Sequence, residues 1–198
     1  MNVLVLFCHP TRDSFQGSIL AAVEAALGGA GHAVRVVDLY AEGFDPVLDA
    51  GAWRAHRHDQ AWPAADLAPH LASLAWAEGL VLVFPTWWYG LPALLKGWFD
   101  RVWQPGAAFT LEDGMFQTNH LTRLGRFAVV TTHGSPGWFI RWIVGDPVRR
   151  QLTRGLALQF ARGVKTCWAP IYGVDGKAPA VLARARDRAV GRAMRLFR

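Results

Sequence analysis

The sequence predicts an α/β domain whose core is a largely parallel β-sheet of five strands, and three observations support this prediction. Short apolar runs alternate with segments of helical periodicity along the 198 residues. The apolar runs show little polar alternation, which is typical of strands covered by helices on both faces. The composition, 52% hydrophobic and 18% charged, is that of a globular chain with one substantial core. Because no linker or repeat divides the chain, we expect residues 1–198 to form a single domain.

The first part of the chain predicts two strands separated by a helix. Residues 2–8 (NVLVLFC) form an aliphatic run and predict the first strand. Residues 15–31 predict a helix that ends in glycines, because apolar residues recur there at helical spacing: Ile19, Leu20, Val23 and Leu27. Residues 33–39 (AVRVVDL) predict the second strand, and residues 40–62 are expected to be irregular.

Strands and helices continue to alternate in the rest of the chain. Residues 64–78 predict a helix, in which Pro69 either introduces a kink or marks the true start. Residues 79–84 (GLVLVF) predict the third strand, and residues 92–103 the helix that follows it. The remaining predicted elements are a fourth strand over 126–132, a helical segment over roughly 147–162, a fifth strand over 164–172 and a final helix over 178–197.

The two cysteines and the N-terminal residues indicate the cellular compartment in which we expect the protein. Cys8 and Cys167 each lie in an apolar, strand-like run without metal or redox spacing, so we expect two buried thiols, no metal site and a cytoplasmic protein. The first residues lack the positive region of a signal peptide. The longest charge-free apolar stretch, Gly79 to Leu95, is broken by prolines and a glycine, so we expect no stable membrane insertion.

The net charge of +6 has two interpretations. Six arginines fall within the last fifteen residues, on the predicted final helix: Arg184, Arg186, Arg188, Arg192, Arg195 and Arg198. Such a cluster is compatible with a nucleic-acid or anionic-membrane patch. No aromatic residues interleave the arginines and no recognition motif accompanies them, so we favour a solvated helix face and expect no nucleic-acid partner.

The loops that follow strands one, three and four are the most unusual in composition. They read HPTRDSFQG, PTWWYG and THGSPGW. In open parallel sheets the ligand lies beyond the carboxyl ends of the strands, which is where these loops would meet. Topology and composition therefore indicate a binding site at the same edge of the sheet.

The first loop leads into a helix and offers groups that suit a phosphate. It carries the His9 imidazole, the hydroxyls of Thr11 and Ser14, and the free amides of a helix N-terminus. It has neither a dinucleotide-binding fingerprint nor a P-loop. Ordinary helix capping by Asp13 or Ser14 is an equally good interpretation.

The second loop places three consecutive aromatic residues, Trp87, Trp88 and Tyr89, in a tight turn. Rigid aromatic walls and backbone amides suit a large flat ligand with a polar edge. Core packing is the alternative, and we expect it for Trp98 and Trp103, which lie at helical spacing.

The third loop ends a buried strand with Thr131, Thr132, His133 and Gly134. The hydroxyls can bond a heteroaromatic edge, and glycine allows close backbone approach, although a plain turn would have the same composition. Together the three loops describe a nucleotide-like ligand with a large planar ring system.

The chain resembles the flavodoxin-like NAD(P)H:quinone oxidoreductases of the DT-diaphorase and modulator-of-drug-activity type. The resemblance rests on HPTRDSFQGSIL, DLYAEGFDPVL, FPTWWYGLPALLKGWFDRVW and TTHGS, which occur in the expected order over most of the chain. It implies a three-layer sandwich with the five parallel strands in the order 2-1-3-4-5. It also implies a bound flavin that NAD(P)H reduces and a quinone-like acceptor reoxidises in a ping-pong reaction.

The resemblance also implies roles for individual residues. The flavin phosphates would be held by His9, Ser14, Phe15 and Gln16. The flavin ring would be flanked by Pro85, Thr86, Trp87, Trp88 and Tyr89, and its pyrimidine side bound by Thr131, Thr132, His133 and Gly134.

Several positions depart from the family pattern. Gln16 replaces an asparagine, His133 replaces the usual second glycine, and Phe139 replaces the tyrosine that covers the substrate pocket in the mammalian enzymes. A Tyr/His proton relay is therefore not expected. The candidate catalytic residues are His133 and Tyr89, with water as the alternative proton source.

The remaining expectations concern substrate, cofactor and partners. Trp138 and Phe139 are candidates for the substrate pocket. FAD is expected, with FMN as the alternative, because the His9 loop and Arg184 suit an adenine nucleotide. Relatives of this type are commonly homodimers, and the resemblance implies a homodimer here too. The alternative function is that of a flavin-binding regulatory or electron-carrier partner of a membrane transporter.

Overall fold

The computed structural model describes residues 1–57, 65–111 and 117–198. Its main sheet has five parallel strands: β1 (Asn2–Phe7), β2 (Ala33–Asp38), β3 (Gly79–Pro85), β6 (Arg126–His133) and β7 (Lys165–Tyr172). Their order across the sheet is β2-β1-β3-β6-β7. Counted among these five strands alone, this is the predicted order, and each strand lies within a residue or two of its predicted range.

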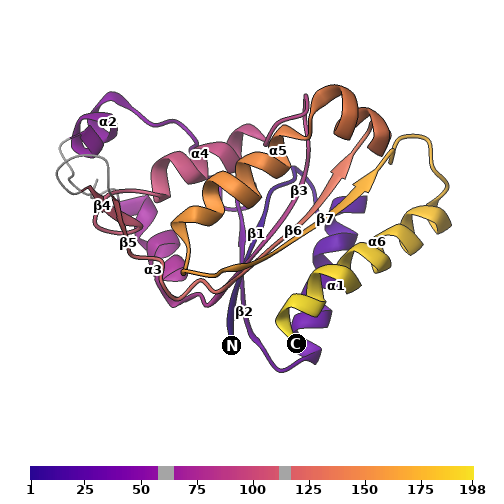
Figure 1. The fold of residues 1–198 in the computed structure, drawn as a ribbon, viewed down its shortest axis with the longest axis horizontal. Helices are drawn as coiled ribbons and strands as arrows, with labels where there is room; N and C mark the ends of the chain where they lie inside the picture. The colour runs from indigo at the N-terminus through magenta and orange to yellow at the C-terminus, as the bar shows by residue number, and fades with distance from the viewer. Residues whose placement is uncertain (58–64, 112–116) are drawn as a thin grey trace.

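Helices cover both faces of the sheet (Figure 1). One face carries α1 (Phe15–Gly29) and α6 (Pro179–Met194). The other carries α3 (Ala68–Trp76), α4 (Ala93–Val102) and α5 (Pro147–Arg150). Side chains of a strand alternate between the two faces, which divides the core into two clusters. In β1, Val3 and Val5 pack toward α1 and α6, whereas Leu4 and Leu6 pack toward α4.

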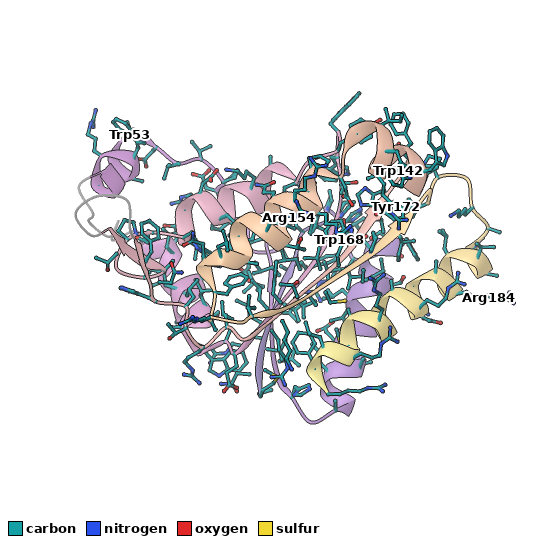
Figure 2. The ribbon with its side chains drawn as sticks, in the orientation of Figure 1. Trp53, Trp142, Arg154, Trp168, Tyr172 and Arg184 are labelled. Carbon is teal, nitrogen blue, oxygen red and sulfur yellow. The ribbon has the colours of Figure 1, made fainter. Side chains whose placement is uncertain are left out.

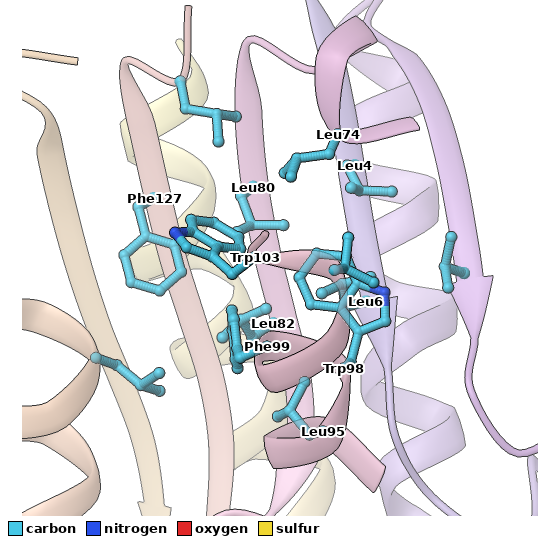
Figure 3. Packing of buried hydrophobic residues seen from close by; sticks show 14 of the residues in the cluster. Leu4, Leu6, Leu74, Leu80, Leu82, Leu95, Trp98, Phe99, Trp103 and Phe127 are labelled. Atoms are coloured by element: carbon cyan, nitrogen blue, oxygen red, sulfur yellow. The ribbon is translucent and has the colours of Figure 1, made fainter. Parts of the chain in front are cut away.

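Aromatic residues fill the core on the α4 side (Figure 3). Trp98 is fully buried and its ring centroid lies 5.3 Å from that of Phe99 and 6.0 Å from that of Trp103. The expected core positions of Trp98 and Trp103 are therefore confirmed. Cys8 is buried as expected, and its burial raises the pKa of the thiol to about 12, whereas Cys167 is only half-buried.

Several short elements were not predicted. The region expected to be irregular contains α2 (Ala50–Arg57), and the Asp49 carboxylate accepts hydrogen bonds from the amides of Gly51 and Ala52 at its start (2.6 and 2.9 Å). A second, antiparallel sheet joins β4 (Phe109–Leu111) to β5 (Gln117–Asn119). Three-residue strands are too short to show an alternating pattern, so periodicity cannot predict them. Residues 58–62 of the region predicted as irregular lie outside the described residues.

The predicted helices are found, with changes at their ends. The short 3₁₀ helix η1 (Ala65–Leu67) precedes α3, and Pro69 lies in the first turn of α3, so it marks a helix start rather than a kink. The segment expected over 147–162 continues from α5 through a π-helix, η3 (Gln151–Gly155), to a 3₁₀ helix, η4 (Leu156–Gln159). A further π-helical segment, η2 (Phe139–Val144), was not predicted, and the 3₁₀ helix η5 (Arg195–Phe197) ends the chain after α6. Within the described residues no helix has the length and apolarity needed to cross a membrane.

Candidate functional site

A cavity of about 380 Å³ lies at the carboxyl edge of the sheet, between the ends of β3 and β6. This volume is in the range of small-molecule sites, roughly 300 to 1,000 Å³. It is lined by Pro85, Thr86, Trp87, Trp88, Tyr89, Thr132, His133, Gly134, Ser135, Ile140, Val174 and Asp175. A larger hollow of about 790 Å³ lies near the start of β7, beside Thr122 and Val164, and its lining includes none of the predicted site residues.

The structure thus brings the loops after β3 and β6 together around one cavity. Every residue of these two loops that was predicted to contact the flavin lines the cavity except Thr131, which is fully buried beneath it. The sequence reasoning missed Ser135, Ile140, Val174 and Asp175. Val174 and Asp175 follow β7, whose carboxyl end meets the same edge, so the topological rule that selected the other loops applies to this one too.

The three aromatic residues after β3 form a strained turn. The Trp87 amide donates to the Gly90 carbonyl (3.2 Å) and the Gly90 amide donates to the Trp87 carbonyl (2.9 Å). Between them, Trp88 and Tyr89 have φ angles of 49° and 62°. Both are therefore left-handed, as in the hairpin turns that usually contain asparagine and glycine. Each such residue with a side chain costs roughly 1–2 kcal/mol.

The side chains of this turn are not core residues. Trp88 is 96% exposed, Trp87 40% and Tyr89 39%. The core-packing alternative is therefore wrong for the triplet, in contrast to Trp98 and Trp103. Strain held at a site with exposed aromatic surface is typical of a binding site.

Replacing Trp88 with glycine is expected to stabilise the ligand-free protein by roughly 1 kcal/mol, because glycine adopts the left-handed backbone without a Cβ penalty. Denaturant unfolding measures the change. The matched control is Trp142→Gly, since Trp142 is 81% exposed on η2 (Figure 2), where glycine should cost roughly 0.5 kcal/mol. A destabilised Trp88→Gly protein would show that indole contacts outweigh the backbone strain.

Thr86 joins the β3 loop to the β6 strand. Its amide donates to the Thr132 carbonyl (2.8 Å), its hydroxyl donates to the same carbonyl (3.0 Å), and its Oγ1 lies 3.1 Å from His133 Nδ1. A hydroxyl has one proton, so all of these contacts are hydrogen bonds only if His133 Nδ1 carries the proton of the ring. This set of contacts favours the Nδ1–H tautomer of His133.

His133 is a neutral, buried imidazole. It is 3% exposed, and burial lowers its pKa to about 4. Its ring lies 4.8 Å from that of Tyr172 and 6.1 Å from that of Trp168, both from β7. Nε2 has no hydrogen-bond partner within the described part of the chain. With no proton on Nε2 and a low pKa, His133 is poorly suited to the proton-donating role considered for it.

The first loop contains a capped helix start. Ser14 is the N-cap of α1, and its Oγ accepts from the Gly17 amide (3.1 Å) and donates to the Thr11 carbonyl (2.9 Å). His9 Nδ1 lies 3.2 Å from the same hydroxyl. The capping interpretation for Ser14 is thus confirmed, and it leaves the first amides of α1 without intrahelical partners.

Two predicted phosphate-binding side chains point inward instead. Gln16 is 3% exposed, and its Oε1 accepts a hydrogen bond from the Thr132 hydroxyl (3.3 Å). Phe15 packs against the core cluster beneath α1. Any contact of these two residues with a phosphate would therefore involve the backbone amides. The Gln16–Thr132 bond also places the first loop beside the cavity.

The residues expected at the substrate pocket extend the aromatic surface outward. The Phe139 ring lies 6.1 Å from Tyr89, and the Trp138 ring lies 5.7 Å from Phe139. Trp138 is 62% exposed. Neither residue lines the cavity itself. Arg184, expected near an adenine phosphate, is exposed on α6 and lies at the outer edge of the molecule in Figure 2.

Comparisons with known proteins agree with this arrangement. A family model described as a flavodoxin-like fold matches residues 1–189. NAD(P)H dehydrogenase (quinone) 1 of Cavia porcellus is 31% identical over 161 residues, covering 73% of this chain and 58% of the relative. Ribosyldihydronicotinamide dehydrogenase (quinone) of Pongo abelii is 30% identical over 163 residues, covering 75% of this chain and 70% of the relative.

A solved structure extends the likeness over the full length. The NAD(P)H:quinone oxidoreductase from Methanothermobacter marburgensis superposes with a TM-score of 0.83 at 26% identity, covering 100% of this chain and 98% of that one. By sequence, the matches to three curated relatives cover 45%, 58% and 55% of their lengths, so this chain spans about half of those proteins. The fold, the site at the strand ends and these matches agree, and the chain belongs to the flavodoxin-like family of NAD(P)H:quinone oxidoreductases.

Proposed function

We propose that the chain is a flavin-dependent NAD(P)H dehydrogenase that reduces quinones and similar acceptors by two-electron hydride transfer, acting as one flavin-binding domain. The observation that carries this proposal is the strained aromatic turn Trp87–Gly90 at the wall of the cavity. A turn that holds tryptophan and tyrosine in left-handed conformations, with their rings exposed, suits a large planar ligand.

The described residues fit a flavin. Trp87 and Tyr89 supply flat walls. The amides of Trp88 and Tyr89 take no part in the two hydrogen bonds of the turn, which join Trp87 and Gly90, so they suit the polar edge of a ring system. At the first loop, the opening amides of α1 and the helix dipole suit a phosphate.

In this proposal the protein contributes orientation and fixed dipoles. A flavin held at this site would supply the redox chemistry, which is hydride transfer from NAD(P)H followed by two-electron reduction of a quinone. Trp87 and Tyr89 restrict where a flat substrate lies, which removes much of the entropic cost of orientation. The turn amides stabilise negative charge at the polar edge of the ring. Trp138 and Phe139 extend the wall to the region where nicotinamide and acceptor would alternate.

We propose that water, rather than His133, donates the proton that quinone reduction consumes. In the Nδ1–H tautomer, which the contacts of Thr86 favour, the ring proton of His133 is engaged with Thr86 and Nε2 carries none. Tyr89, partly exposed at the cavity, is the remaining candidate for contact with the reacting groups.

FAD and FMN are the two candidate forms of the flavin. The composition of the first loop favours FAD. Arg184, which was expected to contact the adenine phosphate of FAD, does not line the cavity. Two structures with similar folds are described in complex with FMN, at 16% and 17% identity. Likeness at that level supports the fold alone, so we retain FAD as the proposed cofactor, with FMN as the alternative.

We further propose a cytoplasmic homodimer. Three tryptophans, Trp88, Trp138 and Trp142, are 96%, 62% and 81% exposed, and exposed rings of this kind suit an interface between two copies of the chain. Light scattering of the purified protein should give twice the chain mass, and a monomeric mass would contradict the dimer.

Steady-state kinetics test the proposed activity. Oxidation of NAD(P)H with a soluble benzoquinone should give parallel double-reciprocal lines as both substrates are varied, as in a ping-pong reaction. Turnover near zero in a protein that binds flavin normally would contradict it and favour the regulatory or electron-carrier role.

Replacing Trp88 with alanine is expected to weaken flavin binding roughly tenfold, about the value of one aromatic contact. The fold should remain intact, because the indole is 96% exposed and supports no core packing. Fluorescence titration of the apoprotein with flavin measures the affinity, and Trp142→Ala serves as the control for loss of an exposed tryptophan. Equal affinities for Trp88→Ala and the unchanged protein would remove Trp88 from the binding site.

A further inference from the structure

The aromatic turn needs support that its own side chains do not provide. Trp88 and Tyr89 are exposed, so packing does not hold their left-handed backbone in place. The residue that follows the turn, Leu91, packs against the core cluster on the α4 side. The residue that precedes the turn, Thr86, is joined to β6 by hydrogen bonds to Thr132 and His133.

The two nitrogens of His133 have different surroundings. Nδ1 donates to Thr86 Oγ1, and this leaves the Thr86 hydroxyl proton for the Thr132 carbonyl. Nε2 is buried and lacks a partner among the described residues. The rings of Tyr172 and Trp168 fix the imidazole plane from the side of β7. Among the described residues, the imidazole therefore makes its hydrogen bond to the site through Nδ1.

We propose that His133 is a positioning residue: its Nδ1–H fixes the Thr86 hydroxyl, and Thr86 in turn holds the Trp87–Gly90 turn in the shape that presents its middle amides to the cavity. The identity of the ligand that these amides bind rests on the proposed function. The shape of the turn does not, since it is a property of the protein alone.

The test exploits the geometry of the amide side chains. Asparagine places an N–H close to the position of Nδ1, whereas glutamine places its amide near Nε2. His133→Asn should therefore keep the bond to Thr86, and His133→Gln should lose it. At the other end of the bond, Thr86→Ser keeps the hydroxyl and Thr86→Val removes it at nearly constant volume.

Two measurements are made on each variant. The first is hydrogen exchange in the flavin-free protein, followed in a peptide spanning 84–92, which includes the hydrogen-bonded amides of Thr86, Trp87 and Gly90. The second is flavin affinity by titration. We expect His133→Gln and Thr86→Val to exchange roughly fivefold faster and to bind flavin roughly fivefold more weakly, as for one lost hydrogen bond. His133→Asn and Thr86→Ser should stay within about twofold of the unchanged protein.

Coupling between the two residues gives an internal check. If they act through one bond, the double variant Thr86→Val/His133→Gln should cost little more than either single change. Additive effects would overturn the proposal, as would unchanged exchange in His133→Gln. If the unchanged protein bound no flavin, the proposed function would fail, yet the exchange comparison would still decide the positioning role. Normal flavin binding with no difference among the four single variants would leave the function standing and overturn the positioning role.

Discussion

Replacing Gly17 with alanine should destabilise the protein by roughly 3 kcal/mol and displace the first loop, because there is no room for the added methyl group. A Cβ at position 17 would lie 1.8 Å from the carbonyl oxygen of Arg12. That atom belongs to the backbone, so it cannot rotate away as the end of a side chain could. The loop that must move carries His9 and the Ser14 cap, so flavin affinity should fall at least tenfold as well.

Gly28→Ala is the matched control for this prediction. Gly28 lies in the same helix, and a Cβ there would meet nothing within 4 Å. Alanine should be neutral at this position or stabilise the helix by up to about 1 kcal/mol. Urea unfolding and flavin titration measure both variants. A Gly17→Ala protein as stable as the control would mean that the loop does not pack against α1 in this way.

His133 should make the protein lose stability in acid, by about 3 kcal/mol between neutral pH and about pH 4. Burial lowers the pKa of His133 from its ordinary 6.5 to about 4. An imidazole with a lowered pKa stabilises the fold fully above the unfolded value of 6.5. As the pH falls below that value, the unfolded chain takes up the proton first, and stability declines until the folded pKa is reached.

Comparison with His133→Asn isolates this contribution. Burial also lowers the pKa of His70, which adds a decline of the same sign, and raises that of Asp146 and Glu42, which acts in the opposite direction. These groups are present in both proteins, so the difference between the two stability curves belongs to His133. Chemical unfolding at a series of pH values measures the curves. Parallel curves from neutral pH to pH 4 would show that the pKa of His133 is the same in the folded and unfolded states, as for a solvated imidazole.

The long elements of the fold could be predicted because each carries a full period of its pattern. The buried strands β1 and β3 are nearly continuous aliphatic runs, and α1 shows apolar spacing followed by glycines. The elements that were missed are short: α2 depends on the capping carboxylate of Asp49, and β4 and β5 have three residues each. The π-helix η2 has no sequence pattern of its own.

The candidate site was predictable where its composition is unusual. Three aromatic residues in a turn indicated a site, and their exposure separates them from Trp98 and Trp103, which helical spacing placed in the core. The loop with Val174 and Asp175 has ordinary residues, so only its place after β7 identifies it. The inward orientation of Gln16 depends on the contact between α1 and β6, which local sequence does not encode.

The most direct test of the proposed function is the visible absorption spectrum of the purified protein, followed by denaturation and chromatography of any released cofactor. We expect a yellow protein with the two visible bands of an oxidised flavin, and release of FAD; release of FMN would correct the nucleotide form and leave the flavin site in place. A colourless protein that also takes up neither FAD nor FMN from solution would contradict the proposed function.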